Sequence, residues 1–156
     1  MALLGVDEIL GHAVRIEQKG EAFYRQWANK TEDKNQKKLF HFLADEEGNH
    51  QRILARLLEE LKTVDFQPQG VNNEAYRERL EMFTREIFLP EPQMDLNSAL
   101  EFALQQEVVS ILFYTDLKSY VPREHVEVMQ HIINEEQKHL ADLEELREKL
   151  LQHGLI

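Results

Sequence analysis

Apolar residues recur at every third or fourth position along most of the 156-residue chain, which is the spacing of one face of an α-helix. The pattern predicts long helices over residues 7–30, 33–62, 96–120 and 122–152. Their ends carry suitable residues: Asp7 and Asp33 as N-caps, Gln36 for a capping box, Pro122 in a first turn and Gly154 as a stop. No segment alternates apolar and polar residues with period two, so no sheet is expected.

Residues 63–95 differ from the rest of the chain in composition. They contain all but one of the chain's prolines, and proline interrupts helices. Within this stretch, apolar residues at helical spacing predict one short helix over residues 74–88. A bundle needs such a long connection when its second and third helices run parallel. We therefore expect an all-α four-helix bundle, forming a single domain over residues 1–156, with a crossover between its second and third helices.

Polar residues interrupt the apolar face of each predicted long helix near its middle. A Glu and a His three residues apart on a helix point the same way, so the pair can bind one metal ion. A single Glu-x-x-His motif is weak evidence in a chain with 29 acidic residues. The candidate ligands are Glu17 in the first helix, Glu47 and His50 in the second, Glu107 in the third, and Glu136 and His139 in the fourth.

The motif occurs twice, and its two copies have similar surroundings. Glu47 and Glu136 are 136 − 47 = 89 residues apart, and the leucine and isoleucine positions around them match at the same separation. Glu17 and Glu107 are 107 − 17 = 90 residues apart, and a Phe-Tyr pair follows each. The repeat predicts a duplicated helix pair. The two copies cover residues 7–62 and 96–152, joined by the crossover 63–95.

The charge of the predicted site requires cations. Four unpaired carboxylates in an apolar core would each cost several kcal/mol, whereas two divalent ions would cancel their charge. The chain has no Cys, which excludes disulfides, thiolate zinc sites, iron–sulfur clusters and a thiol nucleophile. About two ions that accept oxygen and imidazole ligands are expected, and iron, manganese and zinc all meet this condition.

Several residues near the predicted site leave alternatives open. Glu21 lies one turn beyond Glu17 and is either a further ligand or a surface residue. Tyr24 and Tyr114 are either hydrogen-bond donors to ligands or core residues. The other histidines are expected at the surface or its boundary, with His131 paired to Glu135 or Glu127 and His41 paired to Asp45. These histidines are His12, His41, His125, His131 and His153.

Composition also bears on partners and location. A formal net charge of −11 argues against binding nucleic acid, whose phosphates require a basic surface. No apolar run reaches the roughly 20 residues needed to cross a membrane, and residues 1–10 lack the basic start of a signal peptide. We expect a cytoplasmic protein. Large apolar residues away from the ligand faces predict a homodimer: Trp27, Phe66, Phe83 and Phe88.

Four segments resemble the rubrerythrin-like branch of the ferritin superfamily, and the resemblance extends over nearly the whole chain. They are IEQKGEAFY at 16–24, DEEGNH at 45–50, QEVVSILFY at 106–114 and NEEQKH at 134–139. The resemblance implies a ferritin-like bundle in which the six candidate residues are catalytic ligands of two iron ions. It also implies that Glu47 and Glu136 are terminal or chelating ligands and that Glu17 and Glu107 complete the cage.

The activity implied by the resemblance is that of an oxidoreductase. Rubrerythrin-like proteins reduce peroxide or O₂ and so protect against oxidative stress. Rubrerythrins proper also carry a rubredoxin domain with four Cys, and this chain has no Cys. An external electron donor such as rubredoxin is therefore expected. Leu104 stands where rubrerythrins have a further Glu, so the family's movement of a ligand between redox states is not expected here.

Two other functions are compatible with the sequence. The same pair of metal positions could oxidise Fe(II) for storage or other iron handling, which for storage requires a shell of many subunits. Alternatively, the chain could be a metal-free helical adaptor, in which case Glu17 and Glu107 would point outward.

Overall fold

The computed structural model of the chain describes residues 5–62, 73–86 and 94–156. These residues form helices and contain no strand, as the apolar spacing predicts. The bounds are α1 Val6–Lys30, α2 Lys34–Leu61, α3 Asn73–Glu86, α4 Leu96–Lys118, the 3₁₀ turn η1 Arg123–His125, and α5 Val126–Gln152. The predicted all-α bundle is confirmed. The crossover helix is confirmed within residues 73–86, whereas the last two residues of the prediction, 87–88, lie outside the described part.

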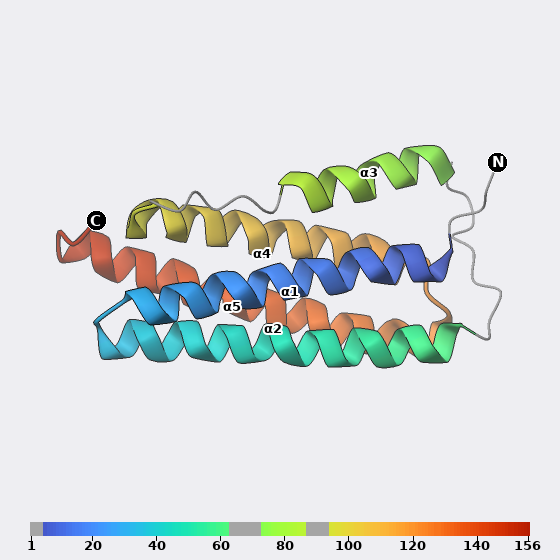
Figure 1. Cartoon of the computed structure of the whole chain (residues 1–156), viewed down its shortest axis with the longest axis horizontal. Helices are drawn as coiled ribbons and strands as arrows, with labels where there is room; N and C mark the ends of the chain where they lie inside the picture. Colours follow the sequence, from blue (N-terminus) through green and yellow to red (C-terminus); the bar gives the residue numbers. More distant parts are fainter. Residues whose placement is uncertain (1–4, 63–72, 87–93) are drawn as a thin grey trace.

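The four long helices form two antiparallel hairpins, α1 with α2 and α4 with α5 (Figure 1). Helices α2 and α4 run in the same direction, as predicted from the long crossover. Helix α3 lies along the outside of the bundle and leads the chain back towards the start of α4. It is attached to α1, since Leu80 is buried in the core and Arg77 Nη1 lies 2.6 Å from Glu8 Oε1.

The helix ends agree with the sequence only in part. The Asp33 carboxylate accepts hydrogen bonds from two backbone amides at the start of α2, so this cap is confirmed. Gln36 accepts a hydrogen bond from the Thr31 hydroxyl, 2.9 Å away, and thus ties the α1–α2 connection together. The prediction for Asp7 is wrong: α1 begins at Val6, and Gly5 occupies the N-cap position.

The start and end of α5 show a similar mixture. Pro122 precedes the short η1 turn and does not open α5 itself. Gly154 has a positive φ of 66° just beyond α5, the left-handed conformation that commonly ends helices. The predicted stop is therefore confirmed.

The apolar core consists of two clusters at opposite ends of the bundle. The N-terminal cluster lies where α1 begins and α2 ends, and the C-terminal cluster lies where α1 ends and α2 begins. The N-terminal cluster includes Ile9, Leu10, Leu54, Leu57, Phe113, Leu117, Met129 and Ile132. The C-terminal cluster includes Phe23, Trp27, Phe40, Leu43, Leu100, Ala103, Leu143 and Leu150. The middle of the bundle, between these clusters, is polar.

Two expectations about apolar residues need correction. Helical spacing from Leu100 and Leu104 predicts that Val108 faces inward, but Val108 is 43% exposed, whereas Ser110 and Phe113 are buried. Helix α4 carries apolar residues on more than one side, so spacing alone did not identify its buried face. Trp27 packs inside the C-terminal cluster and is not free to cover a partner.

The dimer prediction also rests on three phenylalanine residues. Phe66, Phe83 and Phe88 fall outside the part of the chain whose side chains are described, so the dimer stays a prediction. No helix in the described ranges has the length and apolarity required of a membrane span.

Candidate metal centre

The six predicted ligands meet in the middle of the bundle. Helix α1 contributes Glu17, α4 contributes Glu107, and the two Glu-x-x-His motifs come from α2 and α5. All six residues are buried, with exposed fractions of 5% or less. Glu17 and Glu107 therefore point inward, contrary to the arrangement that a metal-free adaptor requires. The six residues are Glu17, Glu47, His50, Glu107, Glu136 and His139.

The six residues form two overlapping groups, each with one possible ligand atom per residue within 4.8 Å of the others. Glu17 and His50 belong to the first group, Glu107 and His139 belong to the second, and Glu47 and Glu136 belong to both. We call these groups the His50 position and the His139 position. The two imidazole rings lie side by side, with centroids 5.7 Å apart.

The shared carboxylates change one expectation from the sequence. Glu47 and Glu136 were expected to be terminal or chelating ligands within separate sites. Because each carboxylate belongs to both groups, the geometry favours a bridging role for them. Glu17 and Glu107 are the carboxylates that belong to one group only.

Several polar atoms that face the middle of the site have no hydrogen-bond partners. They include Glu17 Oε2, both carboxylate oxygens of Glu136, and Nδ1 of both histidines. His50 Nδ1 is 3.1 Å from Glu136 Oε1, and His139 Nδ1 is 3.4 Å from Glu136 Oε2, but neither contact has hydrogen-bond geometry. An unsatisfied buried polar group costs about 1–3 kcal/mol. Oxygen and imidazole atoms directed at shared space fit divalent cations.

The pKa values of these groups reflect the crowding of negative charge. Burial raises the pKa of Glu47 and Glu107 well above the ordinary value, and the neighbouring Glu136 carboxylate raises them further. Burial opposes the charge on His50, but Glu136 and Glu17 outweigh it and raise the His50 pKa to about 12. Without a cation, protons therefore neutralise part of the site, and a metal ion would have to displace them.

Glu136 behaves in the opposite way to the other shared carboxylate. Burial alone would raise its pKa, but Glu107, His139 and His50 beside it lower the pKa below the ordinary value. Glu136, which lies between the two imidazoles, thus stays ionised more readily than Glu47 and Glu107. Its place in both groups makes it the central ligand candidate.

The two tyrosines contact the site reciprocally across the bundle. The Tyr24 hydroxyl on α1 donates a hydrogen bond to Glu107 Oε1 on α4, and the Tyr114 hydroxyl on α4 donates one to Glu17 Oε1 on α1. Burial, together with the adjacent carboxylates, raises the pKa of both hydroxyls. They therefore remain protonated donors that hold the two unshared carboxylates, which answers the question that the sequence left open.

Glu21 lies outside the centre. Its carboxylate accepts hydrogen bonds from Gln51 Nε2 at 2.7 Å and from Arg25 Nε at 3.1 Å. It belongs to neither of the two four-residue groups. It packs instead over Gly48, where an added Cβ would lie 3.0 Å from Glu21 Oε2. Glu21 is therefore a residue of the α1–α2 contact and not a candidate ligand.

Sequence reasoning did not predict a contact that reaches His50 from outside. Glu135 Oε2 lies 2.6 Å from His50 Nε2, and Glu135 Oε1 lies 3.1 Å from His131 Nε2. The predicted His131–Glu135 pair is confirmed. The contact with His50 joins α5 to α2, and its only signal in the sequence is the acidic residue directly before Glu136.

The remaining histidine predictions are partly correct. The predicted His41 pairing is wrong: among the described residues, Asp45 pairs with Arg25, whose Nη2 lies 3.2 Å from Asp45 Oδ1, and not with His41. His12 is buried, with 9% of its surface exposed, and burial lowers its pKa. His125 lies at the boundary, with Nδ1 3.7 Å from Glu60 Oε2.

A small cavity of about 10 Å³ adjoins the site between α1 and α4. It is lined by site residues Glu47 and Glu107 and by Tyr24, Gly20 and Ser110 among others. An added Cβ on Gly20 would lie 3.3 Å from Glu47 Cδ, so the glycine leaves room for that carboxylate. The cavity has space for about one water molecule.

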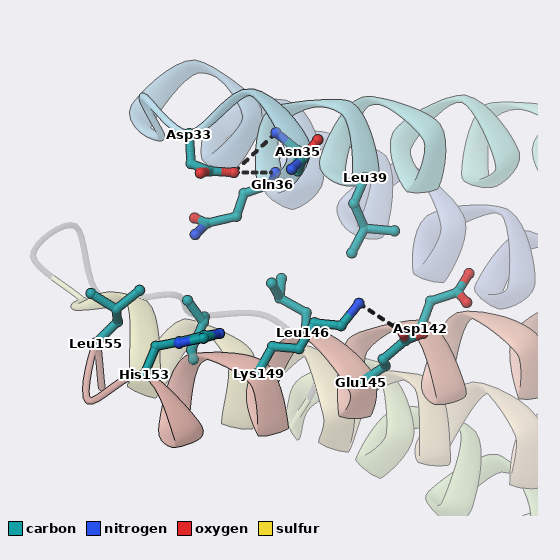
Figure 2. Close-up of a pocket in the computed structure, with 11 residues that line it drawn as sticks. Asp33, Asn35, Gln36, Leu39, Asp142, Glu145, Leu146, Lys149, His153 and Leu155 are labelled. Carbon is teal, nitrogen blue, oxygen red and sulfur yellow. Dashed lines mark hydrogen bonds and ion pairs between the residues drawn. The ribbon is translucent and has the colours of Figure 1, made fainter.

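A much larger pocket lies at the end of the bundle, between the start of α2 and the end of α5 (Figure 2). Its lining includes Asp33, Leu39, Asp142 and Lys149, but none of the six candidate ligands. Figure 2 shows the Asp33 side chain bonded to the first turn of α2. Because none of the six candidate ligands lines this pocket, it is separate from the candidate centre.

Comparisons with known proteins agree with this architecture. The family model described as Rubrerythrin matches residues 8–147, a range that contains all six candidate ligands. A solved structure from Thermotoga maritima, described as a ferritin-like diiron-carboxylate protein, superposes with a TM-score of 0.72. That chain is 27% identical, and the match covers 95% of this chain and 97% of the other. A comparison with curated proteins finds no match.

Proposed function

The chain belongs to the rubrerythrin family, and on that premise we propose that it holds two iron ions and uses them to reduce peroxide or O₂. The proposed ligands of the His50 position are Glu17 and His50, those of the His139 position are Glu107 and His139, and Glu47 and Glu136 serve both. One observation supports this most strongly. Buried carboxylate and imidazole atoms from α1, α2 and α5 lack hydrogen-bond partners, and Glu107 of α4 lies in the same cluster.

The iron ions would supply two electrons, one each, for reducing a bound oxygen species. The protein residues position that chemistry. Tyr24 and Tyr114 hold the Glu107 and Glu17 carboxylates by hydrogen bonds. The apolar clusters at both ends of the bundle exclude water from the site. Manganese or zinc could occupy the same oxygen and nitrogen ligands, and iron is proposed because the reaction requires electron transfer.

The size of the adjoining cavity supports a small substrate. The volume of about 10 Å³ between Gly20, Tyr24 and Ser110 holds about one water molecule and leaves no space for a large substrate. The Tyr24 hydroxyl lines this cavity and keeps its proton, since burial and Glu107 raise its pKa. Because the hydroxyl has one proton, which it donates to Glu107 Oε1, it can only accept a hydrogen bond from a substrate such as H₂O₂.

The proposed reaction needs electrons from outside the chain. No residue in this Cys-free sequence can hold a rubredoxin-type iron centre, so we propose an external donor such as rubredoxin. We also propose a cytoplasmic homodimer, in keeping with the sequence. Leu104 on α4 is half-buried against the C-terminal cluster, so it supplies packing where a further carboxylate would offer a ligand.

The test is rapid mixing of the iron-loaded protein with an oxidant. Protein loaded anaerobically with Fe(II) is mixed with H₂O₂ or, separately, with O₂, in the presence and absence of reduced rubredoxin. We expect one rapid two-electron oxidation by peroxide, followed by turnover only when the donor is present. A Glu47→Ala/His50→Ala variant should lose this oxidation, whereas the control variant Glu21→Gln should keep it.

Two results would contradict the proposed function in different ways. Preference for O₂ with continued Fe(II) uptake into a particle would favour iron storage. If the wild-type protein binds no iron, and the Glu47→Ala/His50→Ala variant behaves in the same way, the assignment of a metal centre is wrong.

A further inference from the structure

We propose that the two metal positions are not equivalent, and that the His50 position binds its ion more tightly because Glu135 positions His50 while His139 lacks such a partner. The inference rests on the proposed two-metal site. It adds a positioning residue, Glu135, and an order in which the two ions bind.

The His50 ring is held from its outer side. Its Nε2 is 2.6 Å from Glu135 Oε2, while its Nδ1 faces Glu17 and Glu136 inside the site. A carboxylate accepts a hydrogen bond but cannot donate one, so the proton of a neutral His50 belongs on Nε2. This tautomer leaves the lone pair of Nδ1 directed at the metal position. Glu135 thus sets both the orientation and the tautomer of His50.

Glu135 is itself held in place. Its second oxygen, Oε1, lies 3.1 Å from His131 Nε2, one turn earlier on α5. The carboxylate is 24% exposed and is therefore only partly screened by water. A chain of three groups, His131, Glu135 and His50, leads from the surface to the His50 position.

The His139 ring has no corresponding partner. Its Nδ1 faces Glu47, Glu107 and Glu136, but its Nε2 is buried without a hydrogen-bond partner among the described residues. On its outer side the ring of Phe42 lies edge-on, with centroids 6.3 Å apart. A phenyl ring offers no carboxylate oxygen to His139, so neither tautomer of this imidazole is favoured from outside.

The internal repeat locates the origin of this difference. The two Glu-x-x-His motifs are 89 residues apart. At the same separation, Phe42 corresponds to His131, since 131 − 42 = 89, and Glu46 corresponds to Glu135, since 135 − 46 = 89. Glu46 is therefore the counterpart of Glu135, but Phe42 cannot hold it as His131 holds Glu135. In the structure Glu46 groups with His50 and Glu135, within 4.8 Å, and leaves His139 without a carboxylate.

The expected size of the effect follows from measurements on other metal sites. Loss of a hydrogen-bonded partner behind a ligating His typically lowers metal affinity by about 10–100-fold. We therefore expect two binding steps separated by about this factor, with the His50 position filled first.

The experiment is cobalt(II) addition followed by calorimetry and visible absorption. Wild-type protein should bind two ions in resolved steps, and His50→Ala and His139→Ala variants assign each step to a position. Glu135→Ala should weaken the tighter step by about 10–100-fold and leave the weaker one as an internal control. Glu135→Gln should recover part of the loss, because its amide oxygen still accepts a hydrogen bond from Nε2.

A second variant tests the same idea by gain of affinity. Phe42→His should give Glu46 a partner at the repeat-equivalent position and strengthen the weaker step, whereas Phe42→Leu should not. Nitrogen NMR of the zinc-loaded protein gives an independent measurement: we expect His50 to keep its proton on Nε2, hydrogen-bonded to Glu135, and the signature of this hydrogen bond to be lost in Glu135→Ala. If Glu135→Ala does not fold, the Phe42 variants and the NMR of the wild type decide the question.

The outcomes separate this inference from the proposed function. If the two ions bind with equal affinity, or if Glu135→Ala weakens both steps alike, the inequivalence is overturned. The two-metal site itself would remain supported. Likewise, a Phe42→His variant with an unchanged weaker step would overturn the role assigned to Phe42. Absence of binding in the wild-type protein would overturn the metal site, and this inference with it.

Discussion

The middle of the bundle and its two ends are built from the same four helices but contribute oppositely to stability. The end clusters bury large side chains such as Phe40 and Leu54, each of which stabilises the fold by about 1.5–3 kcal/mol. The middle buries four carboxylates and two imidazoles, and unpaired charges there cost several kcal/mol each. The ends hold the helices together, and they keep the ligand candidates close even when no cation is bound.

This contrast shows how a metal centre can be preformed. If the ligands had to assemble only when the ions arrive, ordering them would reduce the binding free energy. Here the Tyr24 and Tyr114 hydrogen bonds add a second constraint to that of the end clusters. Four predictions test the contrast, beginning with the largest expected effect.

Removal of the central carboxylate should abolish binding of both ions. Glu136 belongs to both groups, so we expect Glu136→Ala to fall from about two ions per chain to near zero. Elemental analysis after Fe(II) loading and desalting measures this, with Glu21→Gln as the acidic control from outside the site. A Glu136→Ala protein that retained two ions would show that the shared position of Glu136 does not matter.

A substitution in an end cluster should lower stability without changing the number of bound ions. Leu54 is fully buried in the N-terminal cluster, and Leu54→Ala should lower the free energy of unfolding by about 2–5 kcal/mol. The loss should be similar with and without metal, and the ion count should not change. Leu151, 52% exposed, provides the control, since Leu151→Ala should change stability by less than about 0.5 kcal/mol. Denaturant unfolding measures both variants.

The same contrast explains which features of the fold could be predicted from sequence. The helices follow from apolar spacing because each long helix places apolar residues at helical spacing in both end clusters. The six site residues were found because they interrupt those faces and recur in a repeat. Glu17 or Glu107 alone would have been indistinguishable from a surface carboxylate.

The features that could not be predicted depend on contacts between helices. Val108 was placed inward because α4 is apolar on more than one side, and only packing against its neighbours selects the buried face. The contact of Glu135 with His50 joins two helices, so no spacing within either helix reveals it. The start of α1 was missed for a local reason: Asp7 suits a cap by type, but Gly5 occupies that position.

The third prediction concerns pH and the metal-free protein. Burial and neighbouring carboxylates raise the pKa of Glu47 and Glu107, and the His50 pKa rises from 6.5 to about 12. The folded state then binds more protons than the unfolded state, so its stability falls as pH rises. The His50 contribution is fully present below pH 6.5 and is lost as pH rises towards about 12.

The measurement is denaturant unfolding between about pH 6.5 and 8.5, with and without metal. We expect the free energy of unfolding of the metal-free protein to decrease over this range, by at most about 1.4 kcal/mol per pH unit for each group. The metal-loaded protein should respond much less, because its ligands have already lost their protons. His50→Ala should remove the His50 part of the slope. A metal-free protein that becomes more stable with rising pH would contradict the proton assignment.

The smallest expected effects come from the tyrosines, and they distinguish the two metal positions. Tyr114 bonds to Glu17 of the His50 position, and Tyr24 bonds to Glu107 of the His139 position. Replacing either by Phe removes one hydrogen bond and keeps the ring, so stability should fall by about 0.5–1.5 kcal/mol. In the cobalt(II) experiment, Tyr114→Phe should weaken the tighter step and Tyr24→Phe the weaker step, each by less than about tenfold. Because the two hydroxyls contact different carboxylates, the double variant should show both changes without further loss. A single variant that weakened both steps equally would mean that each tyrosine acts on the bundle as a whole and not through its own carboxylate.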